Sequence, residues 1–145
     1  MRPKICGLTT MADKAFLTKR VMVSAMHELK SDSLSEAENL RIFGKCYKTH
    51  GHNYYLEATV EGAIDSASGL SCDRDFFDDV LKKEIVDTYS GTHLNQHFKS
   101  TTGEELAREF YGILFVKLKP LKLVHVRLQE TPKNFFDYGD QNVGI

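Results

Sequence analysis

Residues 43–62 read FGKCYKTHGHNYYLEATVEG and carry a clear strand signal. From His50 onward, every second residue falls into one set, which begins with two histidines and continues apolar: His50, His52, Tyr54, Leu56, Ala58 and Val60. Because successive side chains of a strand point to opposite faces, Asn53, Glu57 and Glu61 lie on the other side. The period therefore predicts a strand with one buried face, toward which both histidines project.

An earlier strand is predicted from Arg20, where RVMVSAMHEL alternates in the same way. Its apolar face carries a histidine and four apolar residues: Val21, Val23, Ala25, His27 and Leu29. The segment between the two strands, SDSLSEAENLRIFGK (31–45), is polar and predicts a long loop with a short helical turn around 36–40. Two strands that carry histidines thus follow one another with one loop between them.

Two helices are predicted next. The first covers 73–89, with Asp73 as N-cap and apolar residues at helical spacing: Phe76, Phe77, Val80, Leu81 and Ile85. The second covers 102–118 and ends before Pro120, and Thr102 followed by Glu105 fits a capping box. One side of it is marked by Leu106, Phe110, Ile113, Leu114 and Lys117.

The last part of the chain predicts two more strands. LKLVHVRLQE (121–130) alternates, and one face holds Val124, Val126, Leu128 and Glu130. NFFDYGD (134–140) predicts a short final strand. The order β-β-α-α-β-β predicts an α+β fold, a four-stranded antiparallel sheet with two helices on one face. Four strands leave two open edges, which favours assembly with other subunits.

Length and composition agree with an ordinary globular protein. The chain has 145 residues, and we expect one domain over 15–145 after a loose N-terminal segment, 1–14. A net charge of −1 is not typical of a nucleic-acid-binding surface. The N-terminus is too polar for a signal peptide, and the three cysteines (Cys6, Cys46 and Cys72) do not form a disulfide pattern. We therefore expect reduced thiols and a cytoplasmic location.

Three histidines on two neighbouring strands, His27, His50 and His52, can converge if the strands pair. Three imidazoles with a fourth position left open are typical of catalytic zinc. Each residue also has a simpler explanation: the H-x-H pair as partly exposed histidines, His27 as a hydrogen-bonded core histidine, and Cys46 as packing. Glu130 ends an apolar strand face, so it either meets a donor or is solvated beyond the end of the strand.

These motifs resemble the family of 6-pyruvoyl-tetrahydropterin synthase and its relative 6-carboxytetrahydropterin synthase of the queuosine pathway. The similarity covers roughly residues 20–139, and it rests on five segments: SAMHEL, SLSEAENLRIFGKC, HGHNYYLEATVEGAIDSASGL, STTGEELA and VRLQETPKNFFDY. SEAENLRIFGKC is similar to the animal pyruvoyl enzymes in particular. The spacing from Cys46 to His50, with three residues between them, is similar to the shorter bacterial carboxy-type loop.

The resemblance implies a tunnelling fold, in which sheets join into a barrel in a trimer and two trimers stack as a hexamer. The active sites then lie between subunits. It also implies one Zn²⁺ per subunit, with His27, His50 and His52 as ligands, and 7,8-dihydroneopterin triphosphate as substrate. We also expect Mg²⁺ to accompany the triphosphate of the substrate, because this ion prefers phosphate oxygens.

Four further residues match functional positions of the family. Cys46 matches the general base, which would remove a proton from carbon beside a hydroxyl. Glu130 matches the acid that anchors the amino-pyrimidine edge of the pterin. Thr102 and Glu104, in TTGE, match a threonine-x-glutamate contact to the pterin. A free thiol has a pKa near 8.5, so a neighbouring cation would make Cys46 a better base by lowering it.

One segment departs from the family pattern. The family carries an Asp-His pair shortly before Leu-Asn or Leu-Asp, whereas this chain reads YSGTHLNQHF (89–98). Alignment on Leu94 and Asn95 puts Ser90 and Gly91 in place of the pair, and alignment on the histidine puts Thr92 in place of the aspartate. Either way the aspartate that would orient the imidazole is missing. We expect His93 to act in proton transfer without it.

Three functions remain open from the sequence. The first is a zinc-dependent lyase of the pyruvoyl type, in tetrahydrobiopterin biosynthesis. The second is the carboxy-type enzyme, which uses the same site and substrate but also releases acetaldehyde. The third is a binding or scaffold protein of the same fold that holds zinc and pterin without turnover.

Overall fold

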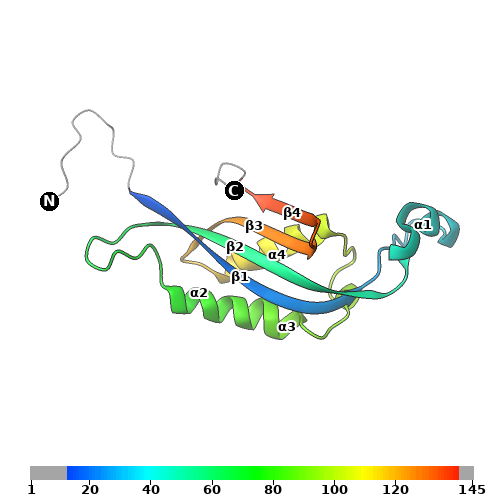
Figure 1. The fold of residues 1–145 in the computed structure, drawn as a ribbon, viewed down its shortest axis with the longest axis horizontal. Coiled ribbons are helices and arrows are strands. Elements are labelled where there is room, and N and C mark those ends of the chain that lie inside the picture. Colours follow the sequence, from blue (N-terminus) through cyan, green and yellow to red (C-terminus); the bar gives the residue numbers. More distant parts are fainter. Residues whose placement is uncertain (1–12, 141–145) are drawn as a thin grey trace, which may run out of the picture.

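The structure, a computed structural model, describes residues 13–140, so most of the predicted loose segment and Cys6 lie outside the described residues. Figure 1 shows a twisted sheet with the strand order β1-β2-β3-β4. All three pairings are antiparallel. The strands are β1 (Lys14–His27), β2 (His50–Ala63), β3 (Lys122–Thr131) and β4 (Asn134–Gly139). The predicted α+β fold is confirmed.

The first strand is longer than the sequence indicated. It begins at Lys14 instead of Arg20, and its added residues pair with the end of β2, from Lys14 opposite Ala63 to Lys19 opposite Ala58. This part was missed because its residues are exposed or only partly buried, which weakens the alternation. Pairing holds it instead, including a 2.7 Å contact between the hydroxyls of Thr18 and Thr59.

Helices cover one face of the sheet. Between β2 and β3 the chain forms α2 (Arg74–Leu81), η2 (Lys82–Val86), α3 (Asp87–Tyr89), η3 (Leu94–Gln96) and α4 (Gly103–Lys117). The first predicted helix is therefore not regular, because η2 is a π-helical turn within it. Asp73 and Thr102 are the N-caps of α2 and α4, as predicted, and each side chain accepts a hydrogen bond from the backbone three residues on.

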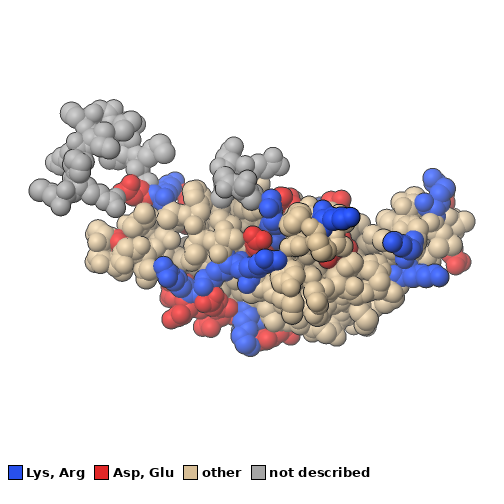
Figure 2. Space-filling view, viewed as in Figure 1, with Lys and Arg blue, Asp and Glu red and all other residues tan. Residues whose placement is uncertain are grey.

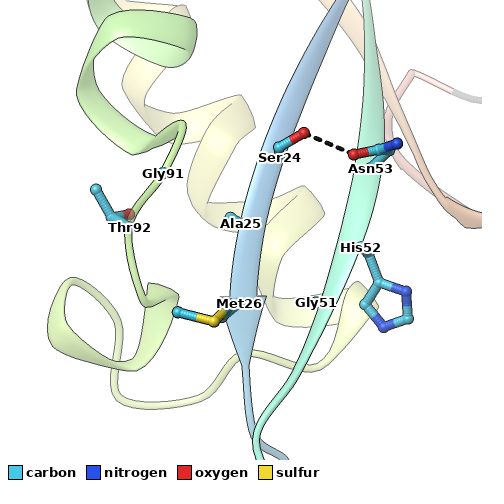
Figure 3. A pocket seen from close by; sticks show the side chains of 8 residues that line it. All are labelled: Ser24, Ala25, Met26, Gly51, His52, Asn53, Gly91 and Thr92. Carbon is cyan, nitrogen blue, oxygen red and sulfur yellow. Dashed lines mark hydrogen bonds between the residues drawn. The ribbon is translucent and has the colours of Figure 1, made fainter.

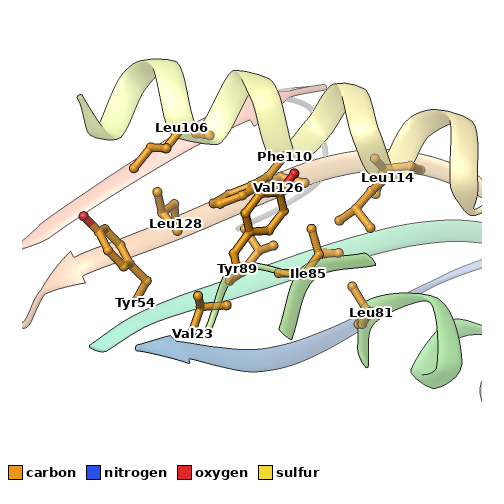
Figure 4. Packing of buried hydrophobic residues seen from close by; sticks show 14 of the residues in the cluster. Val23, Tyr54, Leu81, Ile85, Tyr89, Leu106, Phe110, Leu114, Val126 and Leu128 are labelled. Carbon is orange, nitrogen blue, oxygen red and sulfur yellow. The ribbon is translucent and has the colours of Figure 1, made fainter. Parts of the chain in front are cut away.

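The core lies between this helical layer and the sheet (Figure 4). α4 packs over β3 and β4, while η2 and α3 pack over β1. The strands contribute their predicted apolar faces, among them Val23, Tyr54, Leu56, Val126 and Leu128. Lys117 was wrongly placed on the buried side of α4, where the chain buries Leu118 instead.

The loop between β1 and β2 forms two short helices, α1 (Glu36–Phe43) and η1 (Gly44–Tyr47), which stand beyond the end of the sheet (Figure 1). Ser35 and Glu38 make a capping box at the start of α1. The buried Asn39 side chain ties the loop together by accepting from Ser31 N at 2.8 Å and donating to Ser31 O at 3.1 Å. The predicted helical turn is thus three residues longer than expected and carries its own internal support.

The surface shows no large basic area on the face drawn in Figure 2, where lysine and arginine side chains are interspersed with acidic ones. Acidic side chains gather along α2, which contains Asp75, Asp78 and Asp79. Within residues 13–140, no helix has the length and apolar character needed to cross a membrane.

Candidate active site

Strand pairing brings the three histidines together. His27, the last residue of β1, is opposite His50, the first residue of β2, and Ala25 is opposite His52. The ring centroids lie 4.4 Å (His27–His50), 5.0 Å (His27–His52) and 4.8 Å (His50–His52) apart. His27 is 0% exposed, so this cluster forms where the core reaches the end of the sheet.

Backbone carbonyls fix two of the rings. His27 Nδ1 lies 2.9 Å from Thr101 O, and His50 Nδ1 lies 2.7 Å from Lys48 O. Since a carbonyl can only accept, both Nδ1 atoms carry the proton, and each Nε2 is left with a free lone pair. A metal-binding histidine ordinarily donates its second nitrogen in this way, which sets both the tautomer and the ring orientation.

Glu130, at the end of β3, completes the cluster. Its Oε1 lies 3.3 Å from His27 Nε2 and 3.2 Å from His52 Nε2, and its side chain is 13% exposed. The alternative that Glu130 is solvated beyond the strand is therefore wrong. Neither Nε2 atom makes a hydrogen bond, despite these short distances. Both nitrogens are therefore buried and without a hydrogen-bond partner among the described residues.

This geometry fits a metal ion. One ligand atom from each of His27, His50, His52 and Glu130 can be chosen so that all four lie within 4.8 Å of one another. In a tetrahedral zinc site with bonds of about 2.0–2.1 Å, neighbouring ligand atoms are about 3.3 Å apart. The contacts of Glu130 match that edge, and the orphaned histidine nitrogens would gain a partner. The cluster therefore has the geometry and the ligand types of a metal site.

Electrostatics favour the protonation states that bind a cation. Burial lowers the pKa of His52, and the neighbouring His27 and His50 act in the same sense, while Glu130 opposes them. The pKa of Glu130 is also lowered, chiefly by its close contact with His27, although burial alone would raise it. Neutral imidazole and ionised carboxylate are the forms that a metal requires.

A cavity of about 570 Å³ opens beside the cluster, and it is lined by Leu29, Lys45, Cys46, His50, His52, Glu130, Thr131 and Asn134. Cys46 comes from η1 and is partly buried. Its carbonyl accepts from Leu29 N at 2.8 Å, which holds η1 against the end of β1. A thiol, two imidazoles and a carboxylate therefore line one cavity.

Comparison with known proteins agrees with this arrangement. The family model described as 6-pyruvoyl tetrahydropterin synthase matches residues 16–141. The chain belongs to this family. It is 39% identical over 132 residues to the 6-pyruvoyl tetrahydrobiopterin synthase of Drosophila melanogaster, covering 86% of this chain and 79% of that protein.

Two further relatives carry the names of the two kinds of enzyme in the family. The structure of Caenorhabditis elegans 6-pyruvoyl tetrahydropterin synthase matches with a TM-score of 0.83 and 31% identity, over 91% of this chain and 99% of that one. The 6-carboxy-5,6,7,8-tetrahydropterin synthase of Bacillus subtilis is 28% identical over 141 residues, covering 89% of this chain and 88% of that protein. Both the pyruvoyl and the carboxy branches of the family are thus among its relatives.

Tyr54 is a polar member of the site that sequence reasoning treated only as part of an apolar face. It is 1% exposed, and its ring lies 5.7 Å from that of His27 and 5.3 Å from that of His52. Its hydroxyl has no hydrogen-bond partner among the described residues. Burial, aided by the charge of Glu130, raises the pKa of Tyr54, so the phenol stays protonated. The period of two after His50 and His52 was the signal that could have drawn attention to it.

Thr102 and Glu104 do not join the wall of this cavity. Thr102 accepts a hydrogen bond from Glu105 N at 3.2 Å as the cap of α4, and Glu104 is exposed. The neighbouring Thr101 was missed by the sequence, yet its carbonyl holds His27. A backbone contact of this kind leaves no mark on residue type.

The segment 90–93 contains the residues that either alignment puts in place of the missing Asp-His pair. It lies along the edge of β1. Gly91 N donates to Ser24 O at 2.7 Å, and Met26 N donates to Thr92 O at 3.0 Å. His93 forms a parallel bridge with Met26. Part of the expected open edge is therefore covered. A hollow of about 370 Å³ runs between this segment and the strands, where Ser24 donates to Asn53 at 2.6 Å (Figure 3).

Proposed function

We propose that this chain is a zinc-dependent lyase that eliminates triphosphate from 7,8-dihydroneopterin triphosphate to give 6-pyruvoyl-tetrahydropterin. The observation that carries the proposal is the pair of imidazoles whose Nδ1 atoms are tied to backbone carbonyls, beside an unpartnered third ring. A thiol and a carboxylate border the same cavity. Family membership supports the substrate class, and the identity to the Drosophila melanogaster pyruvoyl enzyme (39%) is higher than that to the Bacillus subtilis carboxy enzyme (28%).

His27, His50 and His52 would hold the zinc ion. A zinc ion there would supply Lewis-acid stabilisation to negative charge that develops along the hydroxylated side chain of the substrate. The carbonyls of Thr101 and Lys48 keep two of the rings in the tautomer that offers Nε2. Because the chain sets these rings before any ligand arrives, little reorganisation is needed when the ion binds.

Glu130 would anchor the pterin ring. Its carboxylate is ionised and mostly buried at the cavity wall, where it can accept two N–H donors from the amino-pyrimidine edge. Fixing the ring in one pose limits where the flexible side chain can lie. With the histidine nitrogens engaged in holding an ion, the carboxylate of Glu130 would be available to the substrate.

Cys46 would be the general base, and His93 would take part in proton transfer. The Cys46 thiol lines the same cavity as His50 and Lys45. His93 lies at the edge of β1, outside the residues that line this cavity. We propose that the chain assembles as a homohexamer of two stacked trimers, with active sites between subunits. In this assembly a neighbouring subunit would complete the site around His93.

Thr102 and Glu104 are proposed as further contacts of the pterin. Glu104 is exposed at the first turn of α4, so this contact would form at a boundary between subunits. The strands β1 and β4 at the edges of the sheet are available for such an assembly, apart from the part of β1 covered by segment 90–93. The open positions on these edges support the proposed barrel.

The carboxy-type reaction is the second candidate. The short spacing between Cys46 and His50 favours it, because η1 leads directly into β2 with only Lys48 and Thr49 between them. The 28% identity to the Bacillus subtilis carboxy-type enzyme also supports the carboxy-type reaction. Both reactions would use the same wall of the cavity, and a binding protein without turnover would use it as well.

The product decides among these functions. Purified protein with measured zinc content is incubated with 7,8-dihydroneopterin triphosphate, and the products are identified by mass spectrometry. We expect 6-pyruvoyl-tetrahydropterin and triphosphate without acetaldehyde. Release of acetaldehyde with a 6-carboxy product would establish the second candidate, and unconsumed substrate would refute both.

Two cysteine variants separate turnover from binding. Cys46→Ala should abolish turnover while it keeps zinc and pterin. Cys72→Ala is the matched control, since Cys72 is also partly buried but packs against the core. Equal turnover in the two variants would show that Cys46 is not the base.

A further inference from the structure

A polar chain joins the end of β1 to His93, and no role proposed above uses it. Thr49 Oγ1 donates to Glu28 Oε2 at 3.0 Å. The same Thr49 oxygen lies 3.5 Å from His93 Nε2. Glu28 follows His27 directly, and Thr49 directly precedes His50. This series of side-chain contacts therefore crosses between the two strands at the point where the histidines meet.

The backbone of Glu28 is held from the side of His93. Glu28 N donates to Asn95 Oδ1 at 2.9 Å, and Asn95 Nδ2 donates to Glu28 O at 3.0 Å. Thr101 Oγ1 also donates to Glu28 O, at 3.0 Å. Asn95 is two residues after His93, so one short segment fixes both the imidazole and the residue whose carboxylate approaches it. Three hydrogen bonds to the backbone N and O of Glu28 make this position well defined.

The protons in the contacts between Glu28, Thr49 and His93 can be assigned. An ionised carboxylate can only accept, so the single Thr49 hydroxyl proton is directed at Glu28. The remaining lone pairs of Thr49 Oγ1 are then available to His93 Nε2, which must carry a proton to donate there. This order leaves Nδ1 of the neutral ring with its lone pair free. A free Nδ1 is what a proton acceptor needs.

We infer that Glu28 is a positioning residue for His93, acting through Thr49 in place of the aspartate that the family's Asp-His pair would supply. The inference rests on the proposed function for the catalytic part of His93's role. It differs from a direct pair because a hydroxyl stands between the carboxylate and the ring. Its structural content is that Glu28 and Thr49 select the Nε2–H tautomer of His93.

The first test reads the tautomer and requires no turnover. Protein labelled with ¹⁵N-histidine is studied by NMR, with the signals of His93 assigned from a His93→Gln variant. We expect the Nε2–H form in the wild type and a mixture in Thr49→Val and Glu28→Gln. Thr49→Ser keeps the hydroxyl and should keep the wild-type signals. A wild-type ring in the Nδ1–H form, or a tautomer unchanged in both variants, would overturn the inference.

The second test reads turnover in the same proteins with zinc content matched. Thr49→Val and Glu28→Gln should lower kcat about ten- to hundredfold with little change in KM, as expected when a proton acceptor is misoriented. Thr49→Ser should retain most of kcat. Thr18→Val and Glu61→Gln are matched controls, because Thr18 contacts Thr59 and Glu61 pairs with Lys14, both away from the histidines.

The two tests separate failure of the inference from failure of the proposed function. If the tautomer shifts in the variants but the wild type turns over no substrate, Glu28 still positions His93 and the lyase proposal fails. If the wild type turns over and kcat is the same in Thr49→Val and Glu28→Gln as in their controls, the inference is refuted while the lyase proposal stands.

Discussion

Replacement of Glu130 by glutamine tests whether this residue is a metal ligand or the anchor of the pterin. Its Oε1 lies 3.2–3.3 Å from two histidine nitrogens, so it has the geometry of a fourth metal ligand. The proposed function instead uses it as the anchor of the pterin. Glu130→Gln keeps the size of the side chain and one acceptor oxygen, but it removes the negative charge and replaces the other oxygen with a donor.

The expected effect follows from the bonds that are lost. An anchor that accepts two N–H groups through an ionised carboxylate loses one charge-assisted hydrogen bond, worth about 2–3 kcal/mol. At about 1.4 kcal/mol per factor of ten, this corresponds to a rise in the Kd for pterin of about 30- to 150-fold. Three imidazoles remain for the metal, so the variant should still bind zinc stoichiometrically.

The assay measures both properties in one protein. Pterin affinity is determined by calorimetry on the zinc-loaded protein, and the metal environment is read from the visible absorption of the cobalt-substituted form. We expect weaker pterin binding with an unchanged cobalt spectrum. A changed cobalt spectrum together with unchanged pterin affinity would refute the anchor role and make Glu130 a ligand. Glu61→Gln, whose carboxylate pairs with Lys14 at 2.7 Å, is the control.

Three further predictions concern stability and are measured by urea unfolding. Gly103→Ala should lower the free energy of unfolding by about 1–3 kcal/mol, since a Cβ there would lie 2.1–2.4 Å from atoms of the Phe136 ring; unchanged stability would show that Phe136 moves aside. Tyr54→Phe should leave the metal-free protein equally stable or about 1 kcal/mol more stable, because its buried hydroxyl has no partner among the described residues; a clear loss would reveal a partner such as water. Burial lowers the pKa of His125, which is 3% exposed, although Asp137 opposes this. The unfolded chain therefore binds a proton more readily as the pH falls below about 6.5, and folding is weakened there. His125→Gln should remove that contribution, so the stability difference between wild type and variant should be smaller at pH 5 than at pH 7.5; a difference that grows instead would contradict the sign of the shift.

Much of the fold was predictable because the burial of this sheet is one-sided. A period of two identified the core face of β2 and that of β3 from Val126 onward, and the caps Asp73 and Thr102 marked where α2 and α4 begin. Val124 was wrongly assigned to this face, because the register shifts beside it and Leu123 joins the core instead. The first half of β1 escaped prediction because its alternation runs between exposed and partly buried residues. The π turn in η2 escaped because it changes the backbone without changing the apolar spacing that predicts a helix.

The candidate site, too, was predictable from the sequence only in part. His27, His50 and His52 could be grouped from the sequence because a strand register places them side by side, and Cys46 and Glu130 follow from where their elements end. The supports of the rings could not be found in this way. The carbonyls of Thr101 and Lys48 are available in any residue type, and only the path of the chain brings them to Nδ1.

His93 shows why a motif alignment and a structure answer different questions. The alignment asks which residue replaces a missing aspartate at a fixed distance along the chain, and it finds Thr92 or Ser90. The structure places His93 against Met26 of β1, which brings it toward the residues that follow that strand. A carboxylate that is remote in sequence, Glu28, is then linked to the ring through Thr49. Loss of an acidic residue from a motif therefore does not by itself imply loss of the proton relay, because a neighbouring strand end can supply the charge.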